Sequence, residues 1–139
     1  MTPYVLDVSL TMGWLFEDEA TDAGWQLLDR AIRTGVTVPS IWAYELANVL
    51  FVAERRGRVT PAQSSAFLNR LDGLRIDIEA TASSHLLAVV LPLARSTGLA
   101  IYDAAYVDLA QRLDLPLATK DRRMAEAAAN LSIRLLPTA

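Results

Sequence analysis

Short apolar stretches alternate with segments of helical periodicity along this chain, and that alternation limits its fold more than any other feature. Five segments have the character of strands, at 4–8, 36–38, 75–78, 116–118 and, as a final edge strand, 133–135. The helical segments are 9–16, 19–33, 40–56, a helix from 60 onward, 81–96, 103–113 and 121–129. Strands that alternate with helices predict a parallel sheet covered on both faces. We therefore expect an α/β protein, a three-layer α/β/α fold with a short, mostly parallel central sheet.

Capping residues and glycines predict several helix ends. Ser40 is a plausible N-cap for the long central helix, and Gly57 ends that helix. Thr60 followed by Pro61 predicts the start of the next helix, because proline is favoured at the first helical position. Pro92 predicts a bend in the helix at 81–96.

Composition excludes several classes of protein. The 139 residues are 53% hydrophobic and only 21% charged, so we expect a single domain, 1–139, with a substantial core. The chain has no cysteine, which excludes a disulfide scaffold, a zinc-thiolate site and thiol catalysis. The N-terminus lacks the pattern of a signal peptide, and the longest apolar run, 86–94, is too short to span a bilayer. We expect a cytoplasmic protein that does not associate with a membrane.

Four acidic residues stand where such a fold turns its chain: Asp7, Glu45, Asp103 and Asp121. Each lies in an apolar stretch, at the end of a predicted strand or in the first turns of a predicted helix. In right-handed βαβ units these positions meet at the carboxyl edge of the sheet, where open α/β sheets bind ligands. Carboxylates brought together repel one another, and the usual reason to gather them is a hard divalent cation. Oxygen-only ligands suit Mg²⁺ or Mn²⁺, so metal-assisted phosphodiester chemistry is the leading hypothesis.

Each acid also has a structural interpretation when taken alone. Asp7, Asp103 and Asp121 could each cap a helix, and Glu45 could be an acid favoured by the helix dipole. Four such residues need not converge on one rim in apolar surroundings, so their joint pattern favours a site.

The sequences around the acids resemble the PIN-domain family and, within it, the VapC-type toxin ribonucleases of toxin–antitoxin pairs. The resemblance is carried by the segments YVLDVSLTMGWLFEDEA, VPSIWAYELANVLFVAERRGRVT and GLAIYDAAYVDLAQRLDLPLATKDRRMAEAA. It implies a PIN-like fold and a metal-dependent endoribonuclease in which Asp7, Glu45, Asp103 and Asp121 bind one or two Mg²⁺ or Mn²⁺ ions. It also implies an RNA substrate, a homodimer, and a small VapB-like antitoxin whose tail occupies the groove beside the acids.

Other polar residues near the acids are assigned smaller roles. By resemblance, Ser9 and Thr119 hydrogen-bond an acid or a metal-bound water, or else they are caps. Asn48 either steadies Glu45 or satisfies a backbone group. Asp108 is expected at the surface, with water-mediated metal binding as the less favoured alternative, and the single histidine, His85, is expected to be a surface or packing residue.

Basic and aromatic residues complete the set of candidates. Lys120, Arg122 and Arg123 bracket Asp121 and could hold RNA phosphates, whereas the basic run 55–58 is expected to be a solvated helix end. Trp14, Trp25 and Trp42 fit core or dimer contacts better than base stacking. The candidates for an exposed apolar contact surface are Trp14, Leu15, Phe16, Trp42 and Phe51, which could equally be core.

Two other classes of function remain open. A receiver-like or phosphatase-like phosphoryl-transfer domain also gathers acids and a lysine at the rim of an α/β sheet. However, Asp7 is followed by Val8 and Ser9, without the second acid that such sites use. A PIN-like module that binds RNA or protein with little or no catalysis is the other alternative, and the presence of all four acids argues against it.

Overall fold

The computed structural model, described here for residues 1–137, has a central sheet of five parallel strands in the order β3-β2-β1-β4-β5. The last two residues of the single domain predicted at 1–139 lie outside the described residues. The strands are β1 (Tyr4–Leu6), β2 (Val36–Pro39), β3 (Ile76–Glu79), β4 (Leu117–Ala118) and β5 (Leu135–Leu136). In register, Val5 pairs with Thr37 on one side and Leu117 on the other. The predicted α/β class is confirmed, and every strand pairing is parallel.

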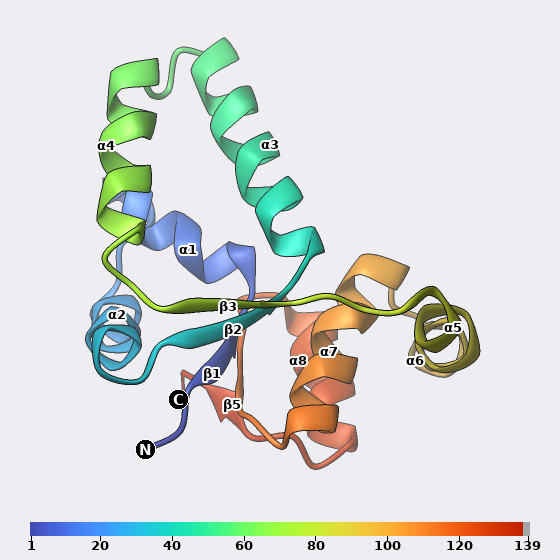
Figure 1. Ribbon diagram of the computed structural model, residues 1–139. Coiled ribbons are helices and arrows are strands. Elements are labelled where there is room, and N and C mark those ends of the chain that lie inside the picture. The colour runs from blue at the N-terminus through green and yellow to red at the C-terminus, as the bar shows by residue number, and fades with distance from the viewer. Residues whose placement is uncertain (138–139) are drawn as a thin grey trace.

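Helices cover both faces of the sheet, with α1 and α2 on one side and α7 and α8 on the other (Figure 1). Figure 1 also shows α3 and α4 projecting as one arm at the top and α5 and α6 lying at the right edge of the view. The helices are α1 (Val8–Leu15), η1 (Glu17–Glu19), α2 (Asp22–Thr34), α3 (Ile41–Arg55), α4 (Pro61–Leu71), α5 (Ser83–His85), η2 (Leu86–Val90), α6 (Leu91–Thr97), α7 (Ile101–Leu113) and α8 (Arg122–Asn130).

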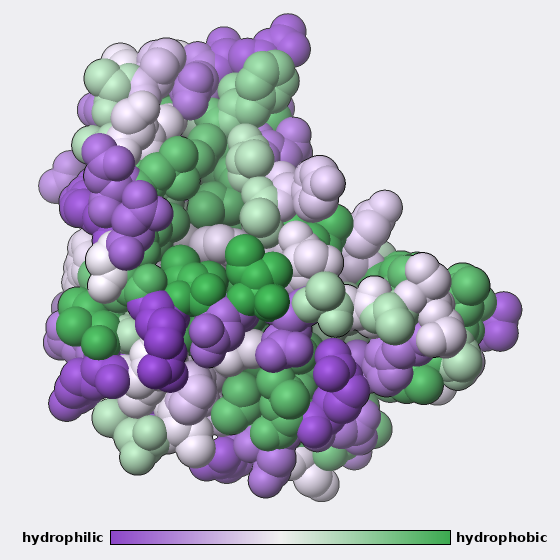
Figure 2. All heavy atoms as spheres, viewed as in Figure 1, coloured by the Kyte–Doolittle hydropathy of each residue, from purple (hydrophilic) through white to green (hydrophobic). Residues whose placement is uncertain are grey.

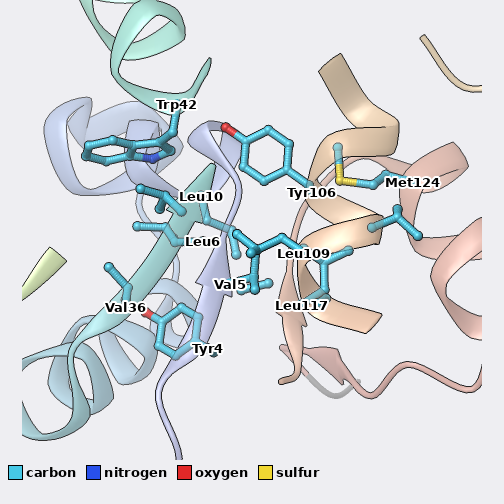
Figure 3. Close-up of a cluster of buried hydrophobic side chains, with 14 of the residues drawn as sticks. Tyr4, Val5, Leu6, Leu10, Val36, Trp42, Tyr106, Leu109, Leu117 and Met124 are labelled. Atoms are coloured by element: carbon cyan, nitrogen blue, oxygen red, sulfur yellow. The ribbon is translucent and has the colours of Figure 1, made fainter. Parts of the chain in front are cut away.

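The central strand β1 is fully buried and supplies core residues to both layers. Tyr4 and Leu6 point to the side of Leu10 and Trp42, whereas Val5 points toward Leu109 (Figure 3). Successive residues of a strand face opposite sides of a sheet, so three residues of β1 suffice to anchor both helical layers. This packing fixes where β1 ends, and therefore where Asp7 lies.

Side-chain caps explain the starts of α2, α4 and α8. Thr60 and Gln63 form a complete capping box at the start of α4, as the Thr60-Pro61 pair predicts. Ser40 occupies the N-cap position of α3, as predicted, but its side chain makes no capping hydrogen bond. The predicted start of α2 at Glu19 is wrong. Glu19 ends the short helix η1, and α2 is capped by the Thr21 hydroxyl, which accepts a hydrogen bond from the Gly24 N–H.

Within residues 1–137, no single helix is long and apolar enough to cross a membrane. The segments Ser83–Thr97 and Ile101–Leu113 reach the required length and composition only when counted together, and they diverge by 108°.

Candidate active site

Asp7 follows the last residue of β1 and is 5% exposed. It occupies the N-cap position of α1, but its side chain makes no capping hydrogen bond. Instead, its Oδ2 atom accepts hydrogen bonds from Ser9 Oγ and Thr119 Oγ1, each at 2.7 Å. The capping interpretation is therefore wrong for this side chain, and the hydrogen bonds expected of Ser9 and Thr119 are present. Neither hydroxyl donates to Oδ1.

The same two hydroxyl groups fasten the turn between β4 and α8 to Asp7. Ser9 Oγ accepts from the Lys120 N–H at 3.0 Å, and Thr119 Oγ1 accepts from the Asp121 N–H at 2.9 Å. Each hydroxyl donates in one direction and accepts from the other, so the carboxylate and the turn hold each other in place. This network brings Asp121 beside Asp7 although 114 positions of sequence separate them.

Glu45 lies on α3 and is partly buried at the start of the projecting arm. Its Oε1 atom accepts a hydrogen bond of 2.6 Å from the hydroxyl of Tyr106, a fully buried residue of α7. This role of Tyr106 was not predicted from the sequence. The available signal was its spacing of three residues from Asp103, which places both residues on one face of a helix. Asn48 makes no hydrogen bond to Glu45 among the described residues, and it is exposed.

Asp103 and Asp121 lie near the starts of α7 and α8, but at different positions relative to the N-cap. Asp103 lies in the first turn of α7, three positions after the N-cap residue Ala100, so it is not the cap that the sequence suggested. Asp121 is the N-cap of α8, and its Oδ1 atom accepts from the Met124 N–H at 3.0 Å. The structural interpretation of Asp121 is thus confirmed, and it leaves the second carboxylate oxygen outside the cap.

Burial and mutual repulsion act on these carboxylates together. Burial raises the pKa of Asp7 above its ordinary value, against the hydrogen bonds from Ser9 and Thr119, and the nearby charge of Asp121 raises it further. Burial also raises the pKa of Glu45, the Tyr106 hydrogen bond opposes that shift, and repulsion from Asp7 and Asp103 adds to it.

Asp103 is affected in the same way. Its pKa is raised first by burial and then by repulsion from Asp121 and Asp7, whereas Arg123 lowers it. Each of the four acids therefore interacts electrostatically with at least one of the others. We call Asp7, Glu45, Asp103 and Asp121 the acidic site. A cation among them would relieve the repulsion that raises these pKa values.

The donor chemistry of the acidic site suits a hard cation, but its side chains are not closed around one. Within the described part of the chain, no three acidic or histidine side chains are arranged to hold a metal ion together. Mg²⁺ keeps several of its waters in proteins and is usually bound by one or two carboxylates. The residues therefore fit an ion held partly through water, with oxygen as the only donor element.

The basic residues beside Asp121 already contact backbone carbonyls. Lys120 Nζ donates to the Glu19 carbonyl at 3.3 Å, and a guanidinium nitrogen of Arg123 donates to the Gly98 carbonyl at 2.7 Å. Both side chains remain exposed at the edge of the site, as does Arg122. The phosphate-binding role that the sequence suggests for these three residues stays a prediction.

Asp108 and His85 differ from what the sequence suggested. Asp108 is 5% exposed, so the expected surface position is wrong. His85 Nε2 lies 3.0 Å from Asp108 Oδ2, and Arg112 Nε lies 3.4 Å from the same oxygen. His85 is thus more than a packing residue, because it joins α5 to α7. These positions were predicted wrongly because the placement of α5 over α7 follows from tertiary packing and not from local sequence.

Most of the predicted contact surface is core. Trp14, Phe16 and Trp42 are buried, with at most 6% of each residue exposed, so they cannot serve as exposed contacts. Phe51 is 56% exposed and Trp25 is 44% exposed. Phe51 alone among the five proposed contact residues is fully on the surface, since Leu15 is partly buried against the core.

Three comparisons place the chain among known proteins. A family model described as PIN domain matches residues 4–130. Ribonuclease VapC3 of Pyrobaculum aerophilum is 36% identical over 84 residues, which are 60% of this chain and 64% of that protein. The chain thus spans somewhat less than two thirds of that relative.

Two solved structures share the fold. The structure of PAE2754 from Pyrobaculum aerophilum aligns with a TM-score of 0.70 and 25% identity, covering 96% of this chain and 83% of that one. FitAcB from Neisseria gonorrhoeae aligns with a TM-score of 0.66 and 18% identity over 95% of both chains, which is a likeness of fold alone.

Proposed function

Because the chain belongs to the PIN-domain family, we propose that its acidic site is the active site of a metal-dependent endoribonuclease, the toxin of a toxin–antitoxin pair. The observation that carries this proposal is the gathering of Asp7, Glu45, Asp103 and Asp121 at one edge of the sheet. A relative of this chain is named a ribonuclease, which supports the same reaction class. A PIN fold does not fit the receiver-like or phosphatase-like alternative.

The four acids would hold Mg²⁺ or Mn²⁺, directly or through water. When bound, such an ion lowers the pKa of a coordinated water and offsets charge on the phosphate during hydrolysis. Asp7 is the firmest candidate ligand, because Ser9 and Thr119 hold its Oδ2 atom and fix its orientation. Glu45 is oriented in the same way by Tyr106. Asp121 uses one oxygen for its helix cap, so water-mediated binding suits it best.

We further propose that an antitoxin and a second copy of the chain are its protein partners, as the family resemblance implies. Among the residues predicted to make such contacts, Phe51 and Trp25 have exposed rings. Expression of the chain with and without the neighbouring reading frame of its operon tests the antitoxin. Growth that is unimpaired by the chain alone would count against the toxin assignment. The homodimer and the cytoplasmic location stay predictions.

RNA cleavage by purified variants tests the active site. Asp7→Asn and Asp103→Asn should each abolish Mn²⁺-dependent cleavage, whereas Asp29→Asn, which alters an exposed acid of α2, should leave it intact. Circular dichroism should show the same fold in all three. Full activity of either active-site variant would overturn the assignment. If the wild-type chain binds RNA but never cuts it in Mn²⁺, the alternative of an inactive binding module is favoured.

A further inference from the structure

Gly13 lies inside α1, where its missing side chain makes room for two groups that pass close to the helix. A Cβ atom at this position would lie 3.1 Å from the carbonyl oxygen of Glu19 and 3.5 Å from Nζ of Lys120. Gly13 is buried, and α1 continues past it to Leu15. Glycine inside a helix is less favourable than alanine, because it loses more conformational freedom on folding. The close approach of Glu19 and Lys120 gives this glycine a structural purpose.

The two groups that use this space are joined to one another. Lys120 Nζ donates to the Glu19 carbonyl oxygen at 3.3 Å. Glu19 is also held by its side chain, because its Oε2 atom lies 2.8 Å from a guanidinium nitrogen of Arg58. Arg58 pairs with Asp18 at 2.9 Å as well, and its guanidinium carbon lies 3.6 Å from the centroid of the Phe16 ring. The carbonyl group that receives Lys120 therefore belongs to a segment, η1, that is fixed independently of the acidic site.

Arg58 belongs to the loop between α3 and α4, so η1 also contacts the projecting arm. Figure 2 shows this arm standing out from the body of the molecule, with the outline indented on the side of α5 and α6. Glu45 is part of α3, the first helix of the arm. Through Arg58 and Lys120, η1 connects the arm to the turn between β4 and α8, which carries Asp121.

Lys120 extends this contact to the acidic site through its backbone. Its N–H donates to Ser9 Oγ at 3.0 Å, and Ser9 Oγ donates to Asp7 Oδ2 at 2.7 Å. Thr119 and Asp121 belong to the same turn and form the other half of that network. The Lys120 side chain is exposed, so its contact with η1 is what restrains it. The hydrogen bond from Nζ thus steadies the residue whose backbone N–H braces Ser9.

We propose that Lys120 is a positioning residue, whose ammonium group anchors the turn between β4 and α8 to η1 across the space that Gly13 leaves open. The anchored turn keeps the hydroxyl groups of Ser9 and Thr119 in place around Asp7. This role differs from the phosphate binding that the sequence suggests for Lys120, because the ammonium group donates to a protein carbonyl. The inference rests on the proposed function, and it adds a residue that acts on the carboxylates through other residues.

Amide hydrogen exchange in EDTA tests the anchor without requiring cleavage or a metal. Lys120→Met removes the ammonium group, whereas Gly13→Ala keeps it but places a methyl group against the Glu19 carbonyl. In both variants the N–H groups of residues 120 and 121 should lose protection by about two- to tenfold, the range expected for one lost hydrogen bond. Because Lys120 is exposed, its variant should fold and decides the question even if Gly13→Ala does not fold.

Gly24→Ala is the matched control for Gly13→Ala. Its added Cβ atom would lie 3.1 Å from Thr21 Oγ1 at the start of α2, so it creates similar crowding without touching Lys120. It should leave the protection of residues 120 and 121 unchanged. The double variant of Gly13→Ala and Lys120→Met should lose no more than Lys120→Met alone, because both substitutions break the same contact.

Mn²⁺ binding and RNA cleavage separate positioning from phosphate binding. A lost phosphate contact raises KM and weakens the salt dependence of RNA binding. A lost positioning contact instead lowers Mn²⁺ affinity and kcat, here by about two- to tenfold. Removal of a cation beside carboxylates would by charge alone tighten Mn²⁺ binding. Weaker Mn²⁺ binding by Lys120→Met, and by Gly13→Ala with its charge intact, would therefore report the displaced turn.

Three results would overturn the proposal: unchanged amide protection in Lys120→Met, additive losses in the double variant, or a raised KM with unchanged Mn²⁺ affinity. Normal cleavage by the wild type together with unchanged protection in the variants defeats the anchor alone. Loss of protection in a protein that never cuts RNA defeats the proposed reaction and leaves the anchor standing.

Discussion

At the scale of single residues, hydroxyl groups determine how the carboxylates lie. Ser9 and Thr119 hold one oxygen of Asp7, and Tyr106 holds one oxygen of Glu45. A buried carboxylate that accepts such hydrogen bonds loses rotational freedom before any ligand arrives. These hydroxyls are therefore positioning residues, and their removal should affect metal affinity more than folding.

Replacement of Tyr106 by phenylalanine tests this role. Tyr106→Phe keeps the buried ring but removes the donor to Glu45, so we expect Mn²⁺ affinity and cleavage to fall by roughly 10- to 100-fold. Since that hydrogen bond lowers the Glu45 pKa, its loss should also move the acidic limb of the pH–rate profile to higher pH. Metal titration and a pH–rate profile measure both effects.

Tyr4→Phe is the matched control for that experiment. Tyr4 is equally buried, and its hydroxyl donates to the Leu27 carbonyl at 2.7 Å, away from the acidic site. Its loss should cost about 1 kcal/mol of stability without changing the pH–rate profile. Equal profiles for Tyr106→Phe and the wild type would contradict the positioning role.

The acidic site was predictable from sequence to the extent that its residues follow local rules. Asp7 directly follows an apolar strand, and Asp103 lies in the first turn of a helix, so the sequence pattern locates both. The spacing of Tyr106 from Asp103 places it on the same helix face, but its hydrogen bond to Glu45 joins residues 61 positions apart, and no local pattern identifies that partner. The pairing of His85 with buried Asp108 was missed for the same reason.

At the scale of the element, Asp121 has a structural and a chemical role that substitution can separate. Asp121→Asn keeps an oxygen that can accept from the Met124 N–H at the start of α8, whereas Asp121→Ala does not. We expect the alanine variant to lose about 1 kcal/mol of stability and the asparagine variant to lose little. If the negative charge of Asp121 contributes to metal binding, RNA cleavage should fall in both variants. Denaturant unfolding and RNA cleavage on the same preparations give the two readouts.

Asp108 of α7 contacts His85 of α5, so its replacement should lower the stability of the protein and leave catalysis unchanged. Asp108→Ala leaves Arg112 and His85 without their shared acceptor, so we expect a loss of about 1–3 kcal/mol with cleavage per folded molecule unchanged. Hydrogen exchange should show faster opening around Ser83–His85. A variant that is fully stable but inactive would show instead that Asp108 acts in the reaction.

A side-chain cap did not by itself make a helix start predictable, because Thr60 was identified as the cap of α4 whereas Thr21, which caps α2, was not. The Thr60 capping box is encoded by neighbouring residues, and it was found. The start of α3 has no side-chain cap at Ser40. Pro92 lies in α6, and the π-helical segment Leu86–Val90 immediately precedes α6 in place of the expected simple bend.

At the scale of the whole molecule, the crowded carboxylates should make the metal-free protein sensitive to pH. The pKa values of Asp7, Glu45 and Asp103 are raised, so the native state binds protons more tightly than the unfolded chain does. Stability contributed by these groups therefore falls as pH rises from their ordinary values near 4 through their raised values. In EDTA, the free energy of unfolding should increase as pH is lowered from neutral toward that range.

Two comparisons isolate the cause. Asp7→Asn removes one of the repelling charges, so it should be more stable than the wild type at neutral pH in EDTA and show a weaker pH dependence. Saturating Mn²⁺ should raise the melting temperature of the wild type and not that of Asp7→Asn. Identical pH dependence in the two metal-free proteins would mean that the carboxylates do not repel one another enough to matter.

The place of β1 at the centre of the sheet has a consequence for synthesis on the ribosome. A chain made from its N-terminus can pair β1 with β2 early, but the other edge of β1 waits for β4, whose residues Leu117 and Ala118 emerge far later. Thr119 and Asp121 follow that strand, so the hydrogen bond from Thr119 to Asp7 cannot form until then. Pairings so distant in sequence also form slowly. The acidic site of a nascent chain would thus stay unassembled until β4 and the start of α8 have been synthesised.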